Sequence, residues 1–292
     1  MSELTRSHLW QLVLINLIWG CNIVAIKLSV DRFPAIFLSF LRFLIVGLLV
    51  WPWLRLRRGE MHWLLTAAVC SGGLQFALMF SGVALSGNMS SVAIASQLGV
   101  PFATLLSVML LGEQIRWRRW LGIGLSFIGI VVLGFNPQVF ASWHGLVLIV
   151  IAAFIGAVGL VAIKRVHELE PLELQAWLAF ASLPFLLPLS LLLEDHQLDS
   201  LRNAGLTGWG ALLYSALLAS LFAHTAYFAL IRRYPVSSVA PITVLAPVFS
   251  VLSAILLLGD VLDWRMVVGG LLTLSGVAVI VAREGKVAAA AT

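Results

Sequence analysis

The chain has 292 residues, of which 61% are hydrophobic and 11% are charged, and its formal net charge is +5. Soluble domains have roughly 45–50% apolar and about 25% charged residues. The composition therefore excludes a soluble protein and predicts an all-α integral membrane protein. Membrane topology accounts for the excess of basic residues, so no nucleic-acid partner is expected.

Ten apolar runs are long enough to cross the hydrocarbon core, which takes about 20 helical residues. They lie at 9–30, 34–54, 63–85, 90–111, 119–135, 145–165, 172–193, 207–231, 236–258 and 265–282. Short loops join them and leave no room for a soluble domain. The first run is too long for a signal peptide and lacks a small-residue cleavage site, so we expect it to remain as a membrane helix.

The sequence contains an internal duplication. The matching segments are Val24-Ala25-Ile26-Lys27 with Val161-Ala162-Ile163-Lys164, Ser90-Ser91-Val92-Ala93 with Ser237-Ser238-Val239-Ala240, and Leu111-Gly112-Glu113 with Leu258-Gly259-Asp260. The first pair is offset by 137 residues and the other two by 147, which places an insertion in the polar stretch 194–205. We therefore predict one repeat at 1–137 and a second at 138–292, with five runs each.

An odd number of runs per repeat places the second copy upside down in the membrane, and the loop charges agree. Basic residues follow the second and fourth runs, whereas mainly acidic residues follow the seventh and ninth. The two sets are Arg55, Arg57, Arg58, Arg116, Arg118 and Arg119, and Glu194, Asp195, Asp199, Asp260 and Asp263. Because basic loops stay in the cytoplasm, both termini are predicted to be cytoplasmic.

These residues also carry a resemblance to a known family. The first copy has Trp19-Gly20, Lys27, Pro34 and Arg42, and both copies end a run with Leu-Gly-Glu/Asp followed by Trp and Gly. The chain resembles the drug/metabolite transporter superfamily, namely the ten-helix exporters with two EamA-type repeats. Within it, the chain is most similar to the YddG-type exporters of aromatic amino acids.

The resemblance implies two inverted five-helix repeats around a central cavity, with the fifth and tenth runs at the periphery. It also implies export of a small molecule across the bacterial inner membrane by alternating access, with no cofactor. The chain would be multi-pass, surrounded by membrane lipids, and a monomer or weak dimer.

The fourth and ninth runs are interrupted at corresponding places. Gly99 and Pro101 interrupt the fourth, and Pro241 and Pro247 interrupt the ninth. A proline leaves a carbonyl without its helical donor, which is tolerated where protein or cavity water can satisfy it. Either simple kinks or a cavity lining would explain them, and the repeat symmetry favours the cavity.

Arg42 lies near the middle of the second run, and its repeat counterpart is Ala179. The architecture therefore does not require an arginine there, and its guanidinium could bind a substrate carboxylate through two hydrogen bonds. The alternative is a structural arginine that bonds to carbonyls of a neighbouring helix or reaches outward to the membrane surface.

Other polar and aromatic side chains lie at similar depth, where polar groups tend to face an interior. His224 could accept a hydrogen bond or titrate, and a satisfied interior histidine is the alternative. The other candidates for substrate binding are Asn22, Gln75, Ser96 and Gln97 as hydrogen-bonding groups, and Trp19, Phe76, Trp177 and Tyr227 as aromatic walls. Interhelical hydrogen bonds and lipid-facing rings are the alternatives for these two sets.

The acidic residues lie in termini, loops or run ends, so no buried carboxylate offers a proton or sodium site. Glu113 and Asp260 are expected to be turn or N-cap residues for the helices that follow them. The sequence has no ATP-binding loop, metal-ligand cluster or catalytic residues.

We therefore predict a secondary exporter of small organic metabolites, with amino acids that carry aromatic or apolar side chains as the substrate class. The alternatives are a lipid or polyprenyl-linked carrier or flippase of the same fold, and an integral membrane enzyme.

Overall fold

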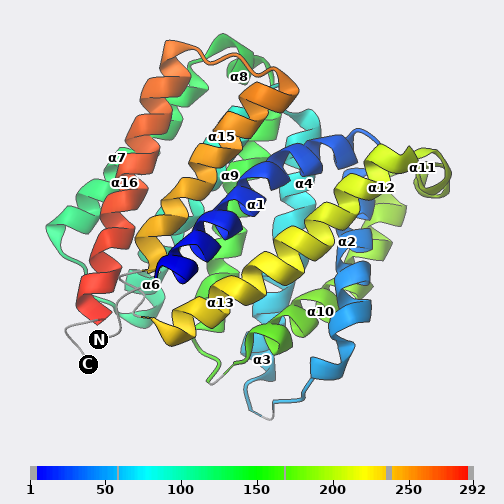
Figure 1. Cartoon of the computed structure of the whole chain (residues 1–292), viewed down its shortest axis with the longest axis horizontal. Coiled ribbons are helices and arrows are strands. Elements are labelled where there is room, and N and C mark those ends of the chain that lie inside the picture. Colours follow the sequence, from blue (N-terminus) through cyan, green and yellow to red (C-terminus); the bar gives the residue numbers. More distant parts are fainter. Residues whose placement is uncertain (1–4, 58, 168, 235–238, 289–292) are drawn as a thin grey trace. The chain divides into compact units, whose positions relative to one another are not determined.

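A computed structural model describes residues 5–57, 59–167, 169–234 and 239–288, without the side chains of 228, 231, 232, 240, 241 and 282–288. All secondary structure in these ranges is helical (Figure 1). In chain order the helices are α1 (Arg6–Val30), α2 (Ala35–Val50), η1 (Trp51–Trp53), α3 (Met61–Ala67), η2 (Ala68–Leu74), α4 (Gln75–Leu85), α5 (Met89–Ser96), α6 (Gly99–Leu111), α7 (Trp117–Gly134), α8 (Pro137–Ala141), α9 (Trp143–Ile163), α10 (Pro171–Leu193), α11 (Gln197–Asn203), α12 (Gly205–Leu213), η3 (Tyr214–Ala223), α13 (His224–Arg233), η4 (Ala240–Val244), α15 (Leu245–Leu258) and α16 (Trp264–Ala288).

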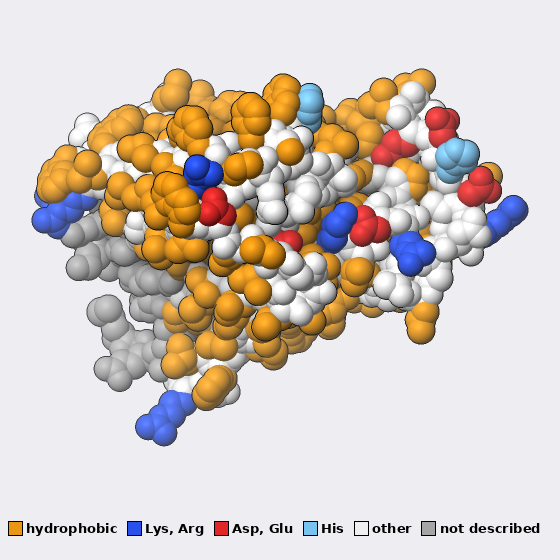
Figure 2. Space-filling view, turned by 90° about the horizontal axis from the view of Figure 1, so that it is seen from above, with side chains coloured by type: hydrophobic (Ala, Val, Ile, Leu, Met, Phe, Trp, Pro, Cys, Tyr) orange, Lys and Arg blue, Asp and Glu red, His pale blue; other side chains and the backbone are white. Residues whose placement is uncertain are grey.

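The predicted runs correspond to helices that are apolar enough to cross a membrane. Nine candidate spans of at least 18 residues occur in the described ranges, and a shorter apolar helix at Ile242–Leu258 matches the ninth run. Ser237 and Ser238, part of the duplicated motif in that run, lie outside the described residues. Figure 2 shows apolar side chains over much of the visible face, with charged side chains in its middle and right parts. The all-α, multi-span fold class is confirmed.

The chain forms two compact units, and each unit draws on both halves of the sequence. The first contains 1–24, 87–143 and 223–292, and the second contains 25–86 and 144–222. Within each unit, helices that correspond in the two repeats pack against each other, namely α7 with α16 and α2 with α10. The repeats at 1–137 and 138–292 are thus interleaved in space, and the boundary between them stays a prediction.

In the first unit, α7 and α16 lie side by side (Figure 1) along a seam of small residues. A Cβ atom at Gly122 would lie 2.7 Å from the Gly276 carbonyl oxygen, and one at Gly269 would lie 2.6 Å from the Gly129 carbonyl oxygen. The helices therefore run antiparallel with their backbones in contact, as small residues allow in membranes.

The seam also repeats itself under the duplication. The offset of 147 residues carries Gly122 onto Gly269 and Gly129 onto Gly276, so one glycine contact becomes the other. Between them, the Ser126 hydroxyl donates to the Thr273 carbonyl and the Thr273 hydroxyl donates to the Ser126 carbonyl, both at 3.4 Å. Such reciprocal contacts are the mark of a two-fold axis, as an inverted repeat requires.

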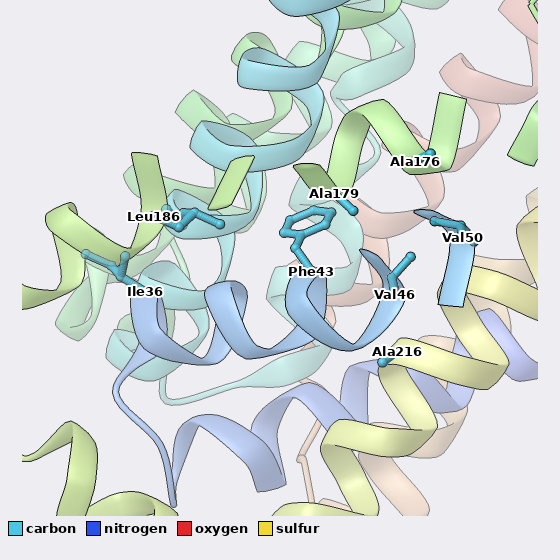
Figure 3. Close-up of a cluster of buried hydrophobic side chains, with 9 residues drawn as sticks. Ile36, Phe43, Val46, Val50, Ala176, Ala179, Leu186 and Ala216 are labelled. Carbon is cyan, nitrogen blue, oxygen red and sulfur yellow. The ribbon is translucent and has the colours of Figure 1, made fainter. Parts of the chain in front are cut away.

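In the second unit, α2 and α10 are also antiparallel. The Glu194 carboxylate, just after α10, accepts hydrogen bonds from the backbone N–H groups of Ile36 (2.8 Å) and Phe37 (2.9 Å) at the start of α2. At the other end, the Trp177 indole donates to the Arg55 carbonyl at 2.9 Å. A buried apolar cluster fills the space between the helices (Figure 3): Ile36, Phe43, Val46, Val50, Ala77, Ala176, Ala179, Leu186 and Ala216.

Two pairs of corresponding spans are irregular at corresponding places. The fourth breaks at Gln97 and Leu98, between α5 and α6, and the offset of 147 carries these residues onto Val244 and Leu245, where η4 gives way to α15. The predicted interruption is therefore present, a few residues before Pro101 and Pro247. The third and eighth spans contain π-helical segments at 68–74 and 214–223, which the same offset superimposes. Such π-helical turns are common at functional sites.

The duplicated Leu-Gly-Glu/Asp motif ends a helix in each repeat. Gly112 and Gly259 adopt left-handed conformations, with φ of 69° and 74°, and their N–H groups bond to the carbonyls of Ser107 and Ala254. Glycine is favoured here because it enters this region without strain. Glu113 and Asp260 both lie in the expected turn, where their backbone N–H groups bond to the carbonyls of Ser107 and Ala254. The N-cap alternative is wrong for Glu113, since Arg116 occupies the N-cap of α7, and the Asp260 side chain hydrogen-bonds to Ser90 at the start of α5.

The inverted topology predicts opposite faces for Gly59 and Gln197. Gly59 follows the C-terminal end of α2, whereas Gln197 follows Glu194 at the N-terminal end of α2. Reporter fusions or thiol labelling after Gly59, Asn88, Pro137 and Gln197 should report inside, outside, outside and outside. If Gly59 and Gln197 report the same face, the inverted topology is wrong.

Candidate functional site

Arg42 is a buried cation on α2, and its side chain is only 3% exposed. Its Nε and Nη2 atoms donate to the Ser220 hydroxyl at 2.9 and 2.5 Å, whereas its Nη1 is buried without a hydrogen-bond partner. Neither structural arrangement considered for Arg42 is present, because the described contacts include no bond to a backbone carbonyl and the side chain does not reach the surface. No carboxylate in the described residues pairs with it.

The π-helical segment η3 supplies Ser220. The wider turn lets the Ser220 hydroxyl donate to the carbonyl of Ser215, five residues earlier, at 2.9 Å, while its oxygen accepts from Arg42. Under the duplication, Arg42 corresponds to Ala179 and Ser220 to Gly73. The corresponding pair in the other repeat therefore has neither a charge nor a hydroxyl, so the fold does not require an arginine–serine pair at this position.

Two phenylalanine rings surround the guanidinium. Its carbon lies 4.3 Å from the centre of the Phe76 ring and 5.7 Å from that of Phe80. Cation–π contacts contribute about 0.5–2 kcal/mol, whereas burying an ion costs several kcal/mol even after relaxation. The rings and one neutral hydroxyl leave the charge of Arg42 largely uncompensated, so an anion beside Nη1 would be favoured.

Three of the predicted aromatic and polar residues come together in the first unit. The Trp19 ring on α1 lies 5.0 Å from the His224 ring and 5.2 Å from the Tyr227 ring, measured between centroids, with the last two on α13. Asn22, also on α1, has a buried Oδ1 atom without a hydrogen-bond partner. The three rings combine flat apolar surface with polar edges, the chemistry expected of a pocket wall.

The remaining candidates lie elsewhere. Gln75 packs against Gly156 of α9, and the Ser96 hydroxyl donates to the Ala93 carbonyl at 2.9 Å. Gln97 lies at the break of the fourth span, Pro101 and Pro247 are buried, and the side chain of Pro241 is outside the described part. Trp177 packs with Leu64 and Val166, in a different cluster from Arg42.

Ser220 and Phe80 were missed in the sequence. A signal for Ser220 was available, because comparing it with Gly73 shows the same asymmetry that singled out Arg42 and Ala179. Phe80 carried no such signal among the 16 phenylalanines of the chain.

Comparisons with known proteins extend over most of the chain. The model of the EamA-like transporter family matches residues 7–135 and again 143–282. A "Probable amino-acid metabolite efflux pump" from Salmonella typhimurium is 31% identical over 90% of this chain and 91% of its own length, and one of the same description from Escherichia coli K12 is 27% identical over the same shares. The "Uncharacterized inner membrane transporter YedA" of Escherichia coli K12 is 28% identical over 85% of this chain and 81% of its own. A solved structure described as "Crystal structure of protein" covers 93% of this chain and 98% of its own, with a TM-score of 0.59 and 19% identity.

Proposed function

Because the chain belongs to the EamA-like transporter family, and so is a multi-pass inner-membrane transporter rather than an enzyme, we propose that it exports amino acids with aromatic or apolar side chains. The Salmonella and Escherichia coli relatives named as amino-acid metabolite efflux pumps support the amino-acid part of this proposal. The finer preference for aromatic or apolar side chains rests on the residues around Arg42.

The observation that carries the proposal is the uncompensated charge of Arg42. Its Nη1 group has N–H donors without a partner, on a side chain that is buried. A substrate carboxylate would satisfy them with charge-assisted hydrogen bonds. Phe76 and Phe80 lie against the same guanidinium, so the substrate side chain would meet an apolar, aromatic surface.

The number of buried cations favours a carboxylate over a polyprenyl diphosphate. Among the described residues of the second unit, Arg42 is the one buried arginine or lysine. One guanidinium matches the single negative charge of a carboxylate, whereas a diphosphate would leave further negative charge unpaired in a dry site.

Alternating access explains how substrate would enter and leave the buried site around Arg42. Arg42 is 3% exposed, so the substrate enters only after the helices rearrange. The breaks at Gln97–Leu98 and Val244–Leu245 provide corresponding hinges in the two repeats. Inverted repeats that rock about such points expose one site to each side in turn.

Counterflow into proteoliposomes tests the function. Vesicles loaded with an unlabelled aromatic amino acid should accumulate its labelled form, and competing leucine or phenylalanine should reduce the uptake more than glycine. Labelled sugars, nucleosides and amphipathic cations form the comparison panel. If one of these classes exchanges and no amino acid does, the proposed substrate class is wrong.

A further inference from the structure

We propose that Asp260 and Ser90 form a latch that holds the fourth and ninth spans together at one end and opens in each transport cycle. One Asp260 carboxylate oxygen, Oδ2, accepts a hydrogen bond from the Ser90 backbone N–H at 2.6 Å and another from its hydroxyl at 2.8 Å. Both residues belong to the first compact unit. The loop charges predict that this end faces outward.

The contact joins the two motifs that the duplication preserves most clearly. Ser90 belongs to the Ser-Ser-Val-Ala motif of the first copy, and Asp260 belongs to the Leu-Gly-Asp motif of the second. Gly259 turns the chain at the end of α15 with a φ of 74°, which brings Asp260 to the N-terminus of α5. A carboxylate is stabilised there by the exposed N–H groups and by the helix dipole.

Capping of α5 does not require Asp260, because the helix has its own cap. Asn88 occupies the N-cap, and its side-chain oxygen accepts from the Ser91 N–H at 2.9 Å. Asp260 therefore adds a connection between two spans, α5 and α15, which also pack against each other. Hydrogen bonds to a charged acceptor are stronger than neutral ones, so this connection favours the packed arrangement.

The helices on the two sides of the latch differ in how they are held. The fourth span breaks at Gln97 and Leu98 directly after α5, and this break is the hinge about which α5 would tilt relative to α6. At the same end, Asn136 donates to Asp263 at 3.1 Å, but that contact joins the segment just after α7 to the residue just before α16, and the backbones of these two helices touch along the glycine seam. The Asn136–Asp263 contact thus connects the ends of α7 and α16, which are closely packed. The Ser90–Asp260 contact connects α5, which is followed by a break, to the end of α15.

Thiol accessibility tests the latch. The reporter is Ala93→Cys, one turn after Ser90 on α5 and 4% exposed, in a background with Cys21→Ser and Cys70→Ser. We expect Asp260→Ala to raise its labelling rate by a membrane-impermeant maleimide well over tenfold, because both hydrogen bonds to the charged acceptor are lost. Ser90→Ala keeps the backbone bond and should raise the rate by about tenfold, the effect of losing one such bond.

Asp263→Ala is the matched control, since it removes the neighbouring acid from the closely packed pair of α7 and α16 and should leave the rate within about twofold. The thermal midpoint of each variant is measured in parallel. If Asp260→Ala does not fold, the labelling rate of Ser90→Ala decides the test. Equal labelling of the background and Ser90→Ala proteins, or an equal rise with Asp263→Ala, overturns the latch.

Discussion

Replacing Arg42 with alanine should abolish amino-acid transport and leave the protein folded. The guanidinium makes its two described hydrogen bonds to one neutral hydroxyl and has no acidic partner in the described residues, so the fold loses little when it is removed. The substrate would lose the one buried cationic partner among the described residues of the second unit. Arg42→Lys should recover part of the activity, because an ammonium cannot make the planar two-bond contact.

The substrate carboxylate provides a sharper test. An amino-acid amide should bind the native protein more weakly than the free acid by about 1.5–3 kcal/mol, the range for hydrogen bonds to charged groups. In Arg42→Ala the same change should cost little more, because the partner is already absent. Competition in counterflow gives both affinities, and Ser220→Ala should weaken binding of the acid less than Arg42→Ala does.

Arg55→Ala serves as the control, because its side chain is exposed and lies outside the membrane span. It should transport like the native protein. Equal binding of acid and amide by the native protein would make Arg42 a structural residue, as would unfolding of Arg42→Ala. The site should then be sought around Trp19, His224 and Gln97.

Valine at Gly129 should prevent normal assembly of the first unit. A Cβ atom there would lie 2.5 Å from the Gly269 carbonyl oxygen and 2.6 Å from the Thr273 backbone nitrogen, and backbone atoms cannot move aside as a flexible side chain can. Overpacking typically costs about 1–3 kcal/mol, and the displaced backbone puts this site at or above the upper end. The expected result is a large drop in the thermal midpoint and in monodisperse yield.

Gly124→Val is the matched control on the same helix, because nothing lies within 4 Å of a Cβ atom at Gly124. Both variants replace a glycine with the same residue and so change helix propensity by the same amount, and the difference between them isolates the packing effect. Equal midpoints for the two variants would contradict a close seam between α7 and α16.

Hydrophobic length predicts the membrane helices because lipid imposes a simple constraint on them. The repeat offsets likewise predict where the irregular parts of the two copies match, as at Gln97–Leu98 and Val244–Leu245. The π-helical segments of the third and eighth spans were not predicted, since they differ from α-helix only in how the backbone bonds are closed. No residue pattern in these segments indicates a π-helix rather than an α-helix.

Side-chain partners were harder to predict than the helices. Asp260 follows one span and precedes another, so the sequence suggested a turn or a cap on the next helix; the turn is present, but the side chain bonds to Ser90, 170 positions away. Trp177 is at mid-run in the sequence, but its indole reaches the Arg55 carbonyl at the end of α2. Arg42 was identified because its repeat counterpart is alanine, and only the fold shows that Ser220 is its partner.

The reciprocal seam between α7 and α16 has a consequence for the origin of the protein. The glycine contacts across the seam, and the two hydrogen bonds between Ser126 and Thr273, map onto one another when the two copies are exchanged. Two identical half-length chains inserted in opposite orientations could therefore make the same interface with each other. A homodimer of such halves would already contain this seam. Tandem fusion of the gene would then keep the seam unchanged, and residues such as Arg42 could diverge from their counterparts afterwards.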